Sequence, residues 1–267
     1  MQAAEAARSI RRPTTDLGAY DYYVRALAAF HPMTKEAIVG AQGLLEQAIA
    51  SDRHYGPALA LAASCNMQFV NYSWAKDPET ARRHAVDLAR LALQVARDDP
   101  GVIASAAMIL AVFGEDIGTM TALGDHALAL NPSCARGWYH SGFLRLMAGE
   151  PNRAIELAET SLRLSPRTRS GPVHTLIGAS HFLSRRFNEA IPKLLLALEE
   201  TPNFPVACRY LAACYARMGR LEEARHAVKR LRAITPAVMP PDIMYLRNAQ
   251  HRELYLSGLR SAAGEAA

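Results

Sequence analysis

Apolar and small residues recur along the chain at the three- and four-residue spacing of an amphipathic helix. The stretch AIVGAQGLLEQAIA, residues 37–50, shows this period, and a second such helix runs from about Asn248 to Leu259. The apolar face of such a helix must be buried against another element. The pattern therefore predicts an all-α protein built from short helices that pack on one another.

Pairs of small residues, separated by twelve positions, recur in three successive segments of the chain. The pairs are Gly142 with Ala154, Gly178 with Ala190, and Ala212 with Ala224. A loop glycine or its substitute follows the first member of each pair, at Gly149, Arg185 and Gly219. The segments therefore repeat one pattern, which is typical of two helices that cross closely at the small pair with a turn between them.

Prolines preceded by small polar residues separate these segments. They stand at Pro132, Pro166, Pro202 and Pro236, with spacings of 34, 36 and 34 residues. A period of about 34 residues with this pattern resembles the tetratricopeptide repeat, a helix-turn-helix unit. The proline cannot continue a helix, so it marks the boundary between units.

The resemblance implies a right-handed α-solenoid of about six repeats with a C-terminal capping helix. The expected units are residues 22–55, 56–100, 101–134, 135–168, 171–204 and 205–238. The second unit is expanded around MQFVNYSWAKDPET, and in the third Met108 and Met120 replace the small pair. We expect residues 1–21 to be a charged linker or helix stub that leads out of an upstream portion. Residues 239–267 should form the capping helix and a disordered tail.

Two local features have alternative interpretations. Trp138, Gly142 and Ala154 could form an aromatic pocket beside a glycine loop, or they could be the packing face of two helices. The recurrence of the small pair favours packing, with Trp138 filling the space around the crossing. Pro192 lies inside an expected helix, where proline costs about 3 kcal/mol. If Asn188 is the N-cap, however, Pro192 falls in the first turn, where the missing N–H costs nothing.

Composition and charge exclude several classes of protein. Half of the 267 residues are hydrophobic, and the net charge is +5. The basic residues are interleaved with acidic ones along the expected helices. This indicates a mixed, solvated surface rather than the clustered basic face of a nucleic-acid-binding protein. The four cysteines form no C-x-x-C pair, and neither a secretory signal nor a membrane-spanning apolar run is found. We expect a cytoplasmic protein without membrane insertion.

Candidate chemistry is sparse. His174 and His181 are seven residues apart on one helix face but have no evident third ligand for a metal ion. The adjacent acids Glu199 and Glu200 point to different faces of a helix, so they are not a general acid/base pair. Phosphate-binding, dinucleotide-binding and hydrolase motifs are not found. The sequence predicts no catalytic, cofactor or metal site.

The tetratricopeptide resemblance places the functional surface in the concave groove that the first helix of each unit lines. It implies that this groove binds a protein or peptide partner or a second copy of the chain. The groove-facing residues would be Arg136, Tyr139, Phe143, Met147, Thr175, Phe182, Arg209 and Arg217. Arginine and aromatic residues dominate interface hot spots, although any solenoid must expose some residues there. The lysine/asparagine clamp for C-terminal carboxylates is not seen, so a chaperone tail is not the expected partner.

Several longer phrases are more specific than the repeat. They are RRPTTDLGAYDYYVRALAAFH, ALALNPSCARGWYHSGFLRLMAGEPNRAIELAETSLRLSP, FPVACRYLAACYARMGRLEEA and RNAQHRELYLSGLR. Together they resemble the C-terminal tetratricopeptide region of rhizobial-type bacterial class III adenylate/guanylate cyclases, over about residues 11–259. The cyclase motifs themselves are not matched, so any catalysis would lie outside this chain.

Three hypotheses follow from the sequence. The first is a regulatory interaction module of a cyclase-type signalling protein. The second is a small-molecule sensor, suggested by Phe69, Tyr72 and Trp74 in the expanded unit. The third, residual cyclase activity in these residues, is not expected.

Overall fold

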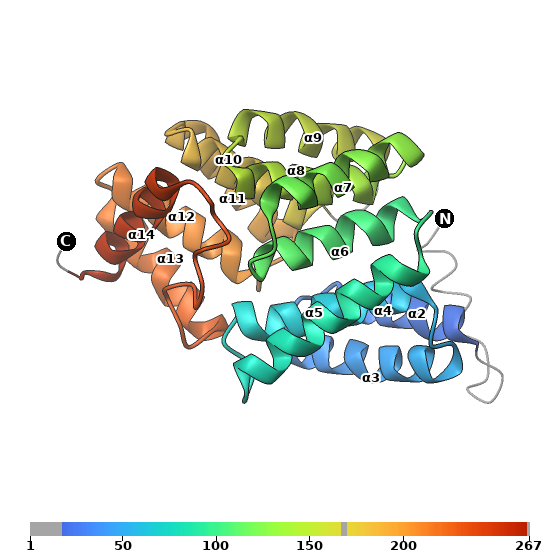
Figure 1. Ribbon diagram of the computed structural model, residues 1–267. Coiled ribbons are helices and arrows are strands. Elements are labelled where there is room, and N and C mark those ends of the chain that lie inside the picture. The colour runs from blue at the N-terminus through green and yellow to red at the C-terminus, as the bar shows by residue number, and fades with distance from the viewer. Residues whose placement is uncertain (1–17, 167–169, 266–267) are drawn as a thin grey trace.

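The computed structural model describes residues 18–166 and 170–265, and within them every regular element is an α-helix (Figure 1). The helices are α2 (Ala19–Phe30), α3 (Lys35–Ser51), α4 (Gly56–Asn71), α5 (Pro78–Val95), α6 (Pro100–Val112), α7 (Ile117–Leu130), α8 (Ala135–Ala148), α9 (Pro151–Leu164), α10 (Gly171–Leu183), α11 (Phe187–Glu200), α12 (Pro205–Arg217), α13 (Leu221–Ile234) and α14 (Ala249–Ala263).

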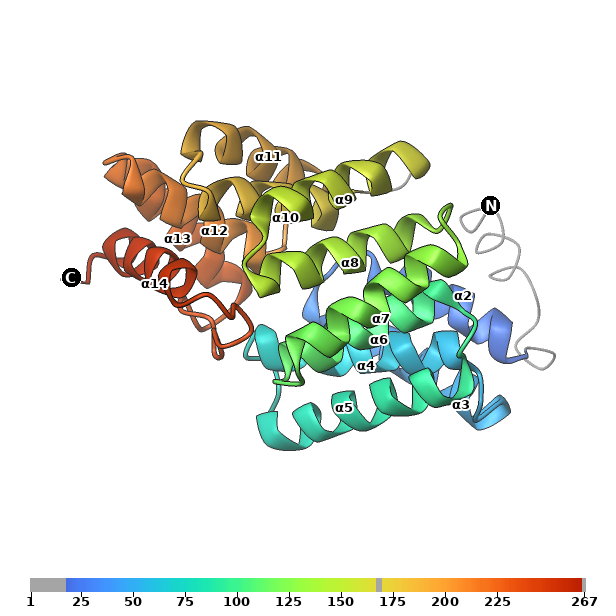
Figure 2. The ribbon, with the colours of Figure 1, turned by 45° about the horizontal axis from the view of Figure 1, so that its top comes forward.

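Consecutive helices pack in pairs from α2 with α3 to α12 with α13, and each pair stacks on the next (Figures 1 and 2). The predicted all-α solenoid is confirmed. Each expected unit corresponds to one helix pair, although α2 begins at Ala19 and α6 at Pro100, before the expected starts at residues 22 and 101. The expected linker lies mostly in residues 1–17, and the end of the unit 135–168 and the last two residues of the tail also lie outside the described residues.

Small residues at the helix crossings have the role that the sequence predicts. A Cβ added to Gly142 would lie 3.2 Å from the carbonyl oxygen of Ala154, and one added to Gly178 would lie 3.3 Å from that of Ala190. The backbones of the paired helices therefore approach so closely that a side chain would force them apart.

The turns within the last three pairs also follow the prediction. Gly149, Arg185 and Gly219 adopt φ angles of 92°, 60° and 73°, in the left-handed region. At Gly149 this conformation ends α8, where the backbone N–H bonds to the carbonyls of the last turn. Arg185 takes the same conformation although it has a Cβ, which is unusual for such a residue.

Two local predictions were wrong. Helix α11 already begins at Phe187, so Pro192 lies inside the helix and Asn188 is not its N-cap. The side chain of Pro192 faces solvent, where the helix tolerates it. Trp138 is half-buried and does not fill the helix crossing. Its indole N–H instead donates to the carbonyl of Pro132 at 2.7 Å and so fastens the loop before α8.

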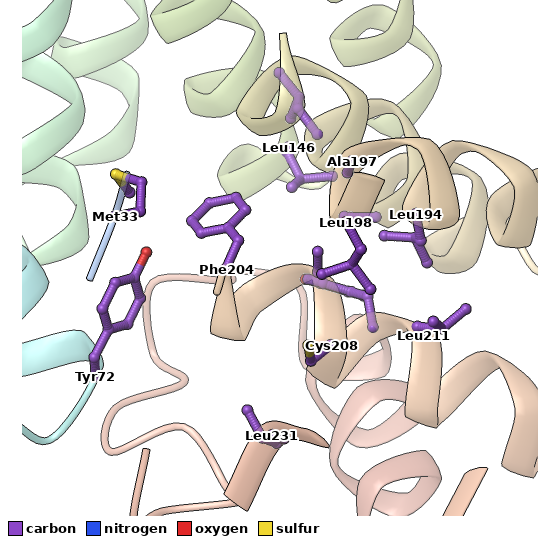
Figure 3. Close-up of a cluster of buried hydrophobic side chains, with 14 of the residues drawn as sticks. Met33, Tyr72, Leu146, Leu194, Ala197, Leu198, Phe204, Cys208, Leu211 and Leu231 are labelled. Atoms are coloured by element: carbon purple, nitrogen blue, oxygen red, sulfur yellow. The ribbon is translucent and has the colours of Figure 1, made fainter. Parts of the chain in front are cut away.

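The solenoid closes on itself. The loop after α4 contacts the end of α13, where the indole N–H of Trp74 donates to the carbonyl of Ile234 at 3.1 Å. Beside it, the hydroxyl of Thr235 donates to the carbonyl of Tyr72 at 2.6 Å. The rings of Tyr72 and Phe204 pack edge-on nearby, with centroids 6.4 Å apart. Both side chains are labelled in Figure 3. The second repeat is therefore joined to the sixth.

The segment 235–248, which we call the strap, continues from this junction across the molecule (Figure 1). At its far end the backbone N–H of Arg247 donates to the carbonyl of Met147 at 2.9 Å. The guanidinium of Arg247 donates to the carbonyls of Ala111 and Glu115 at 2.8 and 3.1 Å. The strap thus ties the ends of α6 and α8 to the C-terminal part of the chain.

Helix α14 follows the strap and packs mainly on α12 (Figures 1 and 2). The ring of Tyr255 stacks on that of Tyr210, with centroids 4.2 Å apart and an interplanar angle of 14°. Phe182 of α10 packs edge-on against both rings. Helix α14 therefore covers the ends of α10 and α12 as well as the end of the stack.

Candidate functional site

A central cavity of about 680 Å³ lies inside the closed solenoid. The first helices of the pairs (α2, α4, α6, α8, α10 and α12, called the inner helices) line it, and the strap contributes residues at one end. Its aromatic lining residues are Tyr20, Tyr23, Phe30, Tyr55, Tyr72, Tyr139, Phe143, Phe204, Tyr245 and Tyr255. The cavity combines a largely apolar wall with few charged groups, as ligand sites in proteins usually do.

Arg136 joins the two sides of the cavity. It is the second residue of α8, and its Nη1 donates to the hydroxyl of Tyr23 on α2 at 3.0 Å, across 113 positions of sequence. The ring of Tyr23 in turn packs edge-on against that of Tyr55, with centroids 5.6 Å apart. The guanidinium is therefore held among tyrosines at the edge of the cavity.

Arg209 holds the strap. Its side chain is 2% exposed, and it donates from Nε to the carbonyl of Val238 and from Nη2 to that of Ala237, both at 2.9 Å. The residues that follow in the strap, Pro240 and Pro241, line the cavity. The inner face thus already binds a stretch of peptide backbone through an arginine fork, and that peptide belongs to the same chain.

Two buried polar groups that line the cavity have no hydrogen-bond partner. They are the hydroxyl of Tyr72 and the Nδ1 atom of His140. Burial, together with the positive charge of Arg136, lowers the pKa of His140 to about 3, so the imidazole is neutral near pH 7. Buried polar atoms are normally paired, so these two unpaired atoms are unusual.

Five of the eight residues predicted to face the groove line the cavity. They are Arg136, Tyr139, Phe143, Thr175 and Arg209. All lie in the first two-thirds of an inner helix, and Arg209 there also donates two hydrogen bonds to the strap. Their contact with a partner stays a prediction.

The other three predicted residues do not line the cavity. Met147 is buried where the strap crosses α8, and Phe182 is buried under the aromatic rings of α12 and α14. Arg217 is exposed, but its guanidinium donates to Leu254 and Ser257 of α14. All three lie near the C-terminal end of an inner helix, which the strap and α14 cover.

Several lining residues were missed from the sequence. Tyr23 and Tyr55 belong to the degenerate first unit, whose register the repeat did not fix. Tyr245 lies on the strap, which has no repeat position. His140 could have been found, because it stands four residues after Arg136 and so shares its helix face.

The histidines and cysteines show no metal site. Within residues 18–166 and 170–265, no group of three His, Cys, Asp or Glu side chains could hold a metal ion. His174 and His181 are each 9% exposed and lie near the carboxylates of Glu200 and Glu189, at 3.9 and 3.2 Å. Burial lowers the pKa of both histidines. Their surroundings are those of packed side chains beside a single acid.

Among the described helices, none is both long and apolar enough to cross a membrane. The cysteines of this part of the chain are free, and Cys65, Cys208 and Cys214 are buried. Burial raises the pKa of the Cys65 thiol to about 12 and that of the Cys208 thiol to about 11. These two thiols are therefore poor nucleophiles.

Comparison with known proteins agrees with this architecture. Residues 181–240 match the family model described as tetratricopeptide repeat. The paired helices of the described chain form an all-α solenoid like that of tetratricopeptide repeats, and the family model itself covers the last part of it. Solenoids of this kind are scaffolds for protein–protein interaction, and their curvature creates the extended concave surfaces that bind partners.

One relative by sequence is the cytochrome c-type biogenesis protein CycH of Rhizobium meliloti (strain 1021). It is 28% identical over 155 residues, which are 56% of this chain and 40% of CycH. The chain therefore spans less than half the length of this relative.

Solved structures share the fold at lower identity. The human IFIT1 dimer with m7Gppp-AAAA matches with a TM-score of 0.66 and 18% identity, over 82% of this chain and 51% of that one. The APC/C hetero-tetramer Cut9–Hcn1 matches with a TM-score of 0.60 and 16% identity, over 93% and 45%. PilW, a type IV pilus biogenesis factor, matches with a TM-score of 0.51 and 16% identity, over 85% and 96%. These likenesses concern the fold.

Proposed function

We propose that the protein binds an extended segment of a partner protein in its central cavity. The observation that carries the proposal is the cavity itself, because the inner helices surround about 680 Å³ with tyrosines, phenylalanines and two arginines. Side chains of these types supply most of the binding energy at protein interfaces when they are desolvated. A cavity of this kind suits a few anchoring side chains of a peptide.

The contact between Arg209 and the strap supports a peptide as the occupant. An arginine on an inner helix donates two hydrogen bonds to consecutive backbone carbonyls at Ala237 and Val238. This is how a groove can hold a chain without depending on its side chains. The strap occupies one end of the groove, so the partner segment lies at the other end, beside Arg136 and Phe143.

A small molecule is the second candidate ligand. The volume of the cavity falls within the roughly 300–1,000 Å³ of small-molecule sites. The sequence suggested a small-molecule site at Phe69, Tyr72 and Trp74. Of these three residues, Tyr72 lines the cavity, whereas Phe69 and Trp74 do not. A thermal-shift screen with a metabolite library separates the two candidates, since a sensor is stabilised by single compounds without any peptide.

The biological process is proposed on sequence grounds. The resemblance to cyclase tetratricopeptide regions supports a role in regulating a cyclase whose catalytic residues lie outside this chain. The similarity to CycH supports instead a role in cytochrome c-type biogenesis. Co-purification of the tagged protein from its own cells distinguishes the two roles, because the first predicts a cyclase among the partners and the second predicts proteins of cytochrome c-type biogenesis. A cytoplasmic location and self-association stay predictions that the same experiment addresses.

Peptide selection tests whether the cavity is the binding site. A displayed library of random twelve-residue peptides is selected on the wild-type protein, and the binders are then measured on two variants. Val173→Trp puts a large ring at a half-buried position that lines the cavity, and Leu195→Trp puts the same ring on the outer surface of the same repeat. We expect binding to be lost in the first variant and kept in the second.

A further variant guards against a folding defect. Phe143→Gln removes an apolar contact from the cavity at a half-buried position without adding volume. We expect weaker binding with an unchanged far-UV circular dichroism spectrum. Binders that are equally tight on wild type, Val173→Trp and Phe143→Gln would contradict the proposal, and so would a library without any enriched peptide.

A further inference from the structure

Arg136 has more hydrogen-bonding capacity than its surroundings use. A guanidinium carries five N–H donors, and the described contacts of Arg136 use one of them, from Nη1 to the hydroxyl of Tyr23. Among residues 18–166 and 170–265, no carboxylate forms an ion pair with it. The nearby Asp99 is already engaged, since its Oδ1 accepts the N–H groups of Gly101 and Val102 and caps α6.

Arg209, the second arginine of the cavity, does not have the same unused donors. Two of the donors of Arg209 are used by the strap carbonyls, and the side chain is buried. Arg136 is half-buried and lines the cavity at the end that the strap leaves free. A guanidinium fork of this kind matches a carboxylate, with which it forms two parallel hydrogen bonds.

The residues that follow Arg136 on the inner face of α8 determine how a bound peptide would run along the cavity. Tyr139, His140 and Phe143 follow Arg136 at three, four and seven residues, so they continue the same face along the cavity. Arg136 and Phe143 are separated by about 10 Å along the helix axis. An extended peptide covers that distance in about three residues.

Independent groups of the same cavity also point to a ligand. The Nδ1 atom of His140 and the hydroxyl of Tyr72 are buried and unpartnered, and their residues are 9% and 0% exposed. The N-cap of α8, Cys134, makes no side-chain hydrogen bond to the first amides of the helix beside Arg136. The inner face of the cavity therefore has polar atoms without partners as well as the unused donors of Arg136, and an incoming carboxylate accepts from the guanidinium.

We propose that the cavity binds a peptide segment with an acidic side chain against Arg136 and an aromatic or branched apolar side chain, about three residues away, against Phe143 and Tyr139. This proposal rests on the proposed function, because it specifies the chemistry of the segment that the cavity takes. The acidic group gains the bidentate hydrogen bonds, and the apolar group gains burial among the rings.

The selected peptides test this directly. We expect an enrichment of Asp or Glu about three positions from an aromatic or branched apolar residue, and we expect these peptides to bind when synthesised as C-terminal amides. Arg136→Gln should weaken binding about tenfold or more, because a charge-assisted hydrogen bond is lost. Arg153→Gln removes the same charge from the exposed outer helix α9 and should leave binding within about twofold.

The peptides also provide a test that does not require any variant to fold. Replacing the acidic residue of a selected peptide by its amide should weaken its binding to wild type by about tenfold or more. Equal affinity of the acidic and amide peptides for wild type would overturn this proposal, as would peptides that need a free C-terminal carboxylate. If such peptides still lose binding to Val173→Trp, the proposed function stands without this proposal.

Discussion

The indole N–H of Trp74 donates to the carbonyl of Ile234, 160 positions further along the chain, at 3.1 Å. In an open solenoid each repeat contacts only its neighbours, so stability is close to a sum of local terms. Here the second repeat is bonded to the end of the sixth. The second and sixth repeats are therefore coupled directly, as well as through the repeats between them.

Loss of this bond should destabilise both of the segments that it joins. Trp74→Phe removes the indole N–H, and we expect a loss of about 1 kcal/mol in the free energy of unfolding. Because the bond joins the loop after α4 to the end of α13, hydrogen exchange of the amides in both helices should accelerate together. Urea unfolding and hydrogen–deuterium exchange measure the two effects.

A matched control is available in the other tryptophan. Trp138→Phe removes an indole N–H that donates to Pro132, only six residues away. Its effect should stay within α8 and the preceding loop. Thr235→Val removes the second bond of the Trp74 junction, so its cost should be less than additive with that of Trp74→Phe. Independent, additive costs would show that the junction does not act as a unit.

The strap depends on a glycine at the end of α8. Gly149 has a φ of 92°, and an added Cβ would lie 3.2 Å from the Cβ of Asn248. We expect Gly149→Ala to cost about 1–2 kcal/mol, because the left-handed conformation disfavours any Cβ. Gly40→Ala lies in open space on the exposed face of α3 and should instead stabilise the protein by about 0.5–1 kcal/mol. Thermal unfolding of both variants checks the opposite signs.

Pro192 is a point where the sequence can be improved. It lies inside α11 and faces solvent, so Pro192→Ala loses little packing and restores a backbone donor. We expect a gain of about 1–3 kcal/mol in the free energy of unfolding. Pro151→Ala, at the first position of α9, should change stability by less than about 0.5 kcal/mol. A loss of stability in Pro192→Ala would mean that the helix is built around the proline.

His140 should make the protein sensitive to acid. Its folded pKa of about 3 lies below the ordinary 6.5, so between these values the unfolded chain binds a proton that the folded chain does not. The contribution of the neutral His140 to the free energy of unfolding is therefore fully present above about pH 6.5 and is lost as the pH falls toward 3. Between pH 7.5 and 5.0 the loss amounts to about 2 kcal/mol.

Urea unfolding at the two pH values tests this contribution. The wild type should lose about 2 kcal/mol more than His140→Gln over that interval. His84→Gln, on the exposed face of α5, should keep the wild-type dependence. Identical pH dependences for wild type and His140→Gln would show that the imidazole is not buried in neutral form.

The sequence predicted those parts of the fold that depend on contacts between neighbouring helices. The Gly142–Ala154 crossing and the turn at Gly149 recur with the repeat, so the period alone locates them. The strap and the Trp74–Ile234 junction join distant segments and leave no periodic signal. For this reason Met147 and Phe182 were placed in the groove, although the strap and α14 bury them.

The residues of the candidate site were likewise predicted only where they lie in a well-defined repeat. Arg136, Tyr139 and Phe143 lie in a well-defined repeat, and their helix face could be derived from their spacing. Tyr23, which receives the hydrogen bond of Arg136, lies in the degenerate first unit. Its meeting with Arg136 depends on the curvature of the whole solenoid, which no local pattern encodes.

Methionine methyl signals test the proposed binding site most directly. Met33, Met67 and Met108 line the cavity, whereas Met218 lies at the end of α12 and Met244 is 58% exposed on the strap. The protein is labelled with ¹³C at the methionine methyl groups, and a selected peptide is added until binding is saturated. Peptide binding in the cavity predicts shifts of the Met33, Met67 and Met108 signals with Met218 and Met244 nearly unchanged. Shifts confined to Met218 and Met244 would place the partner on the outer surface and contradict the proposed function.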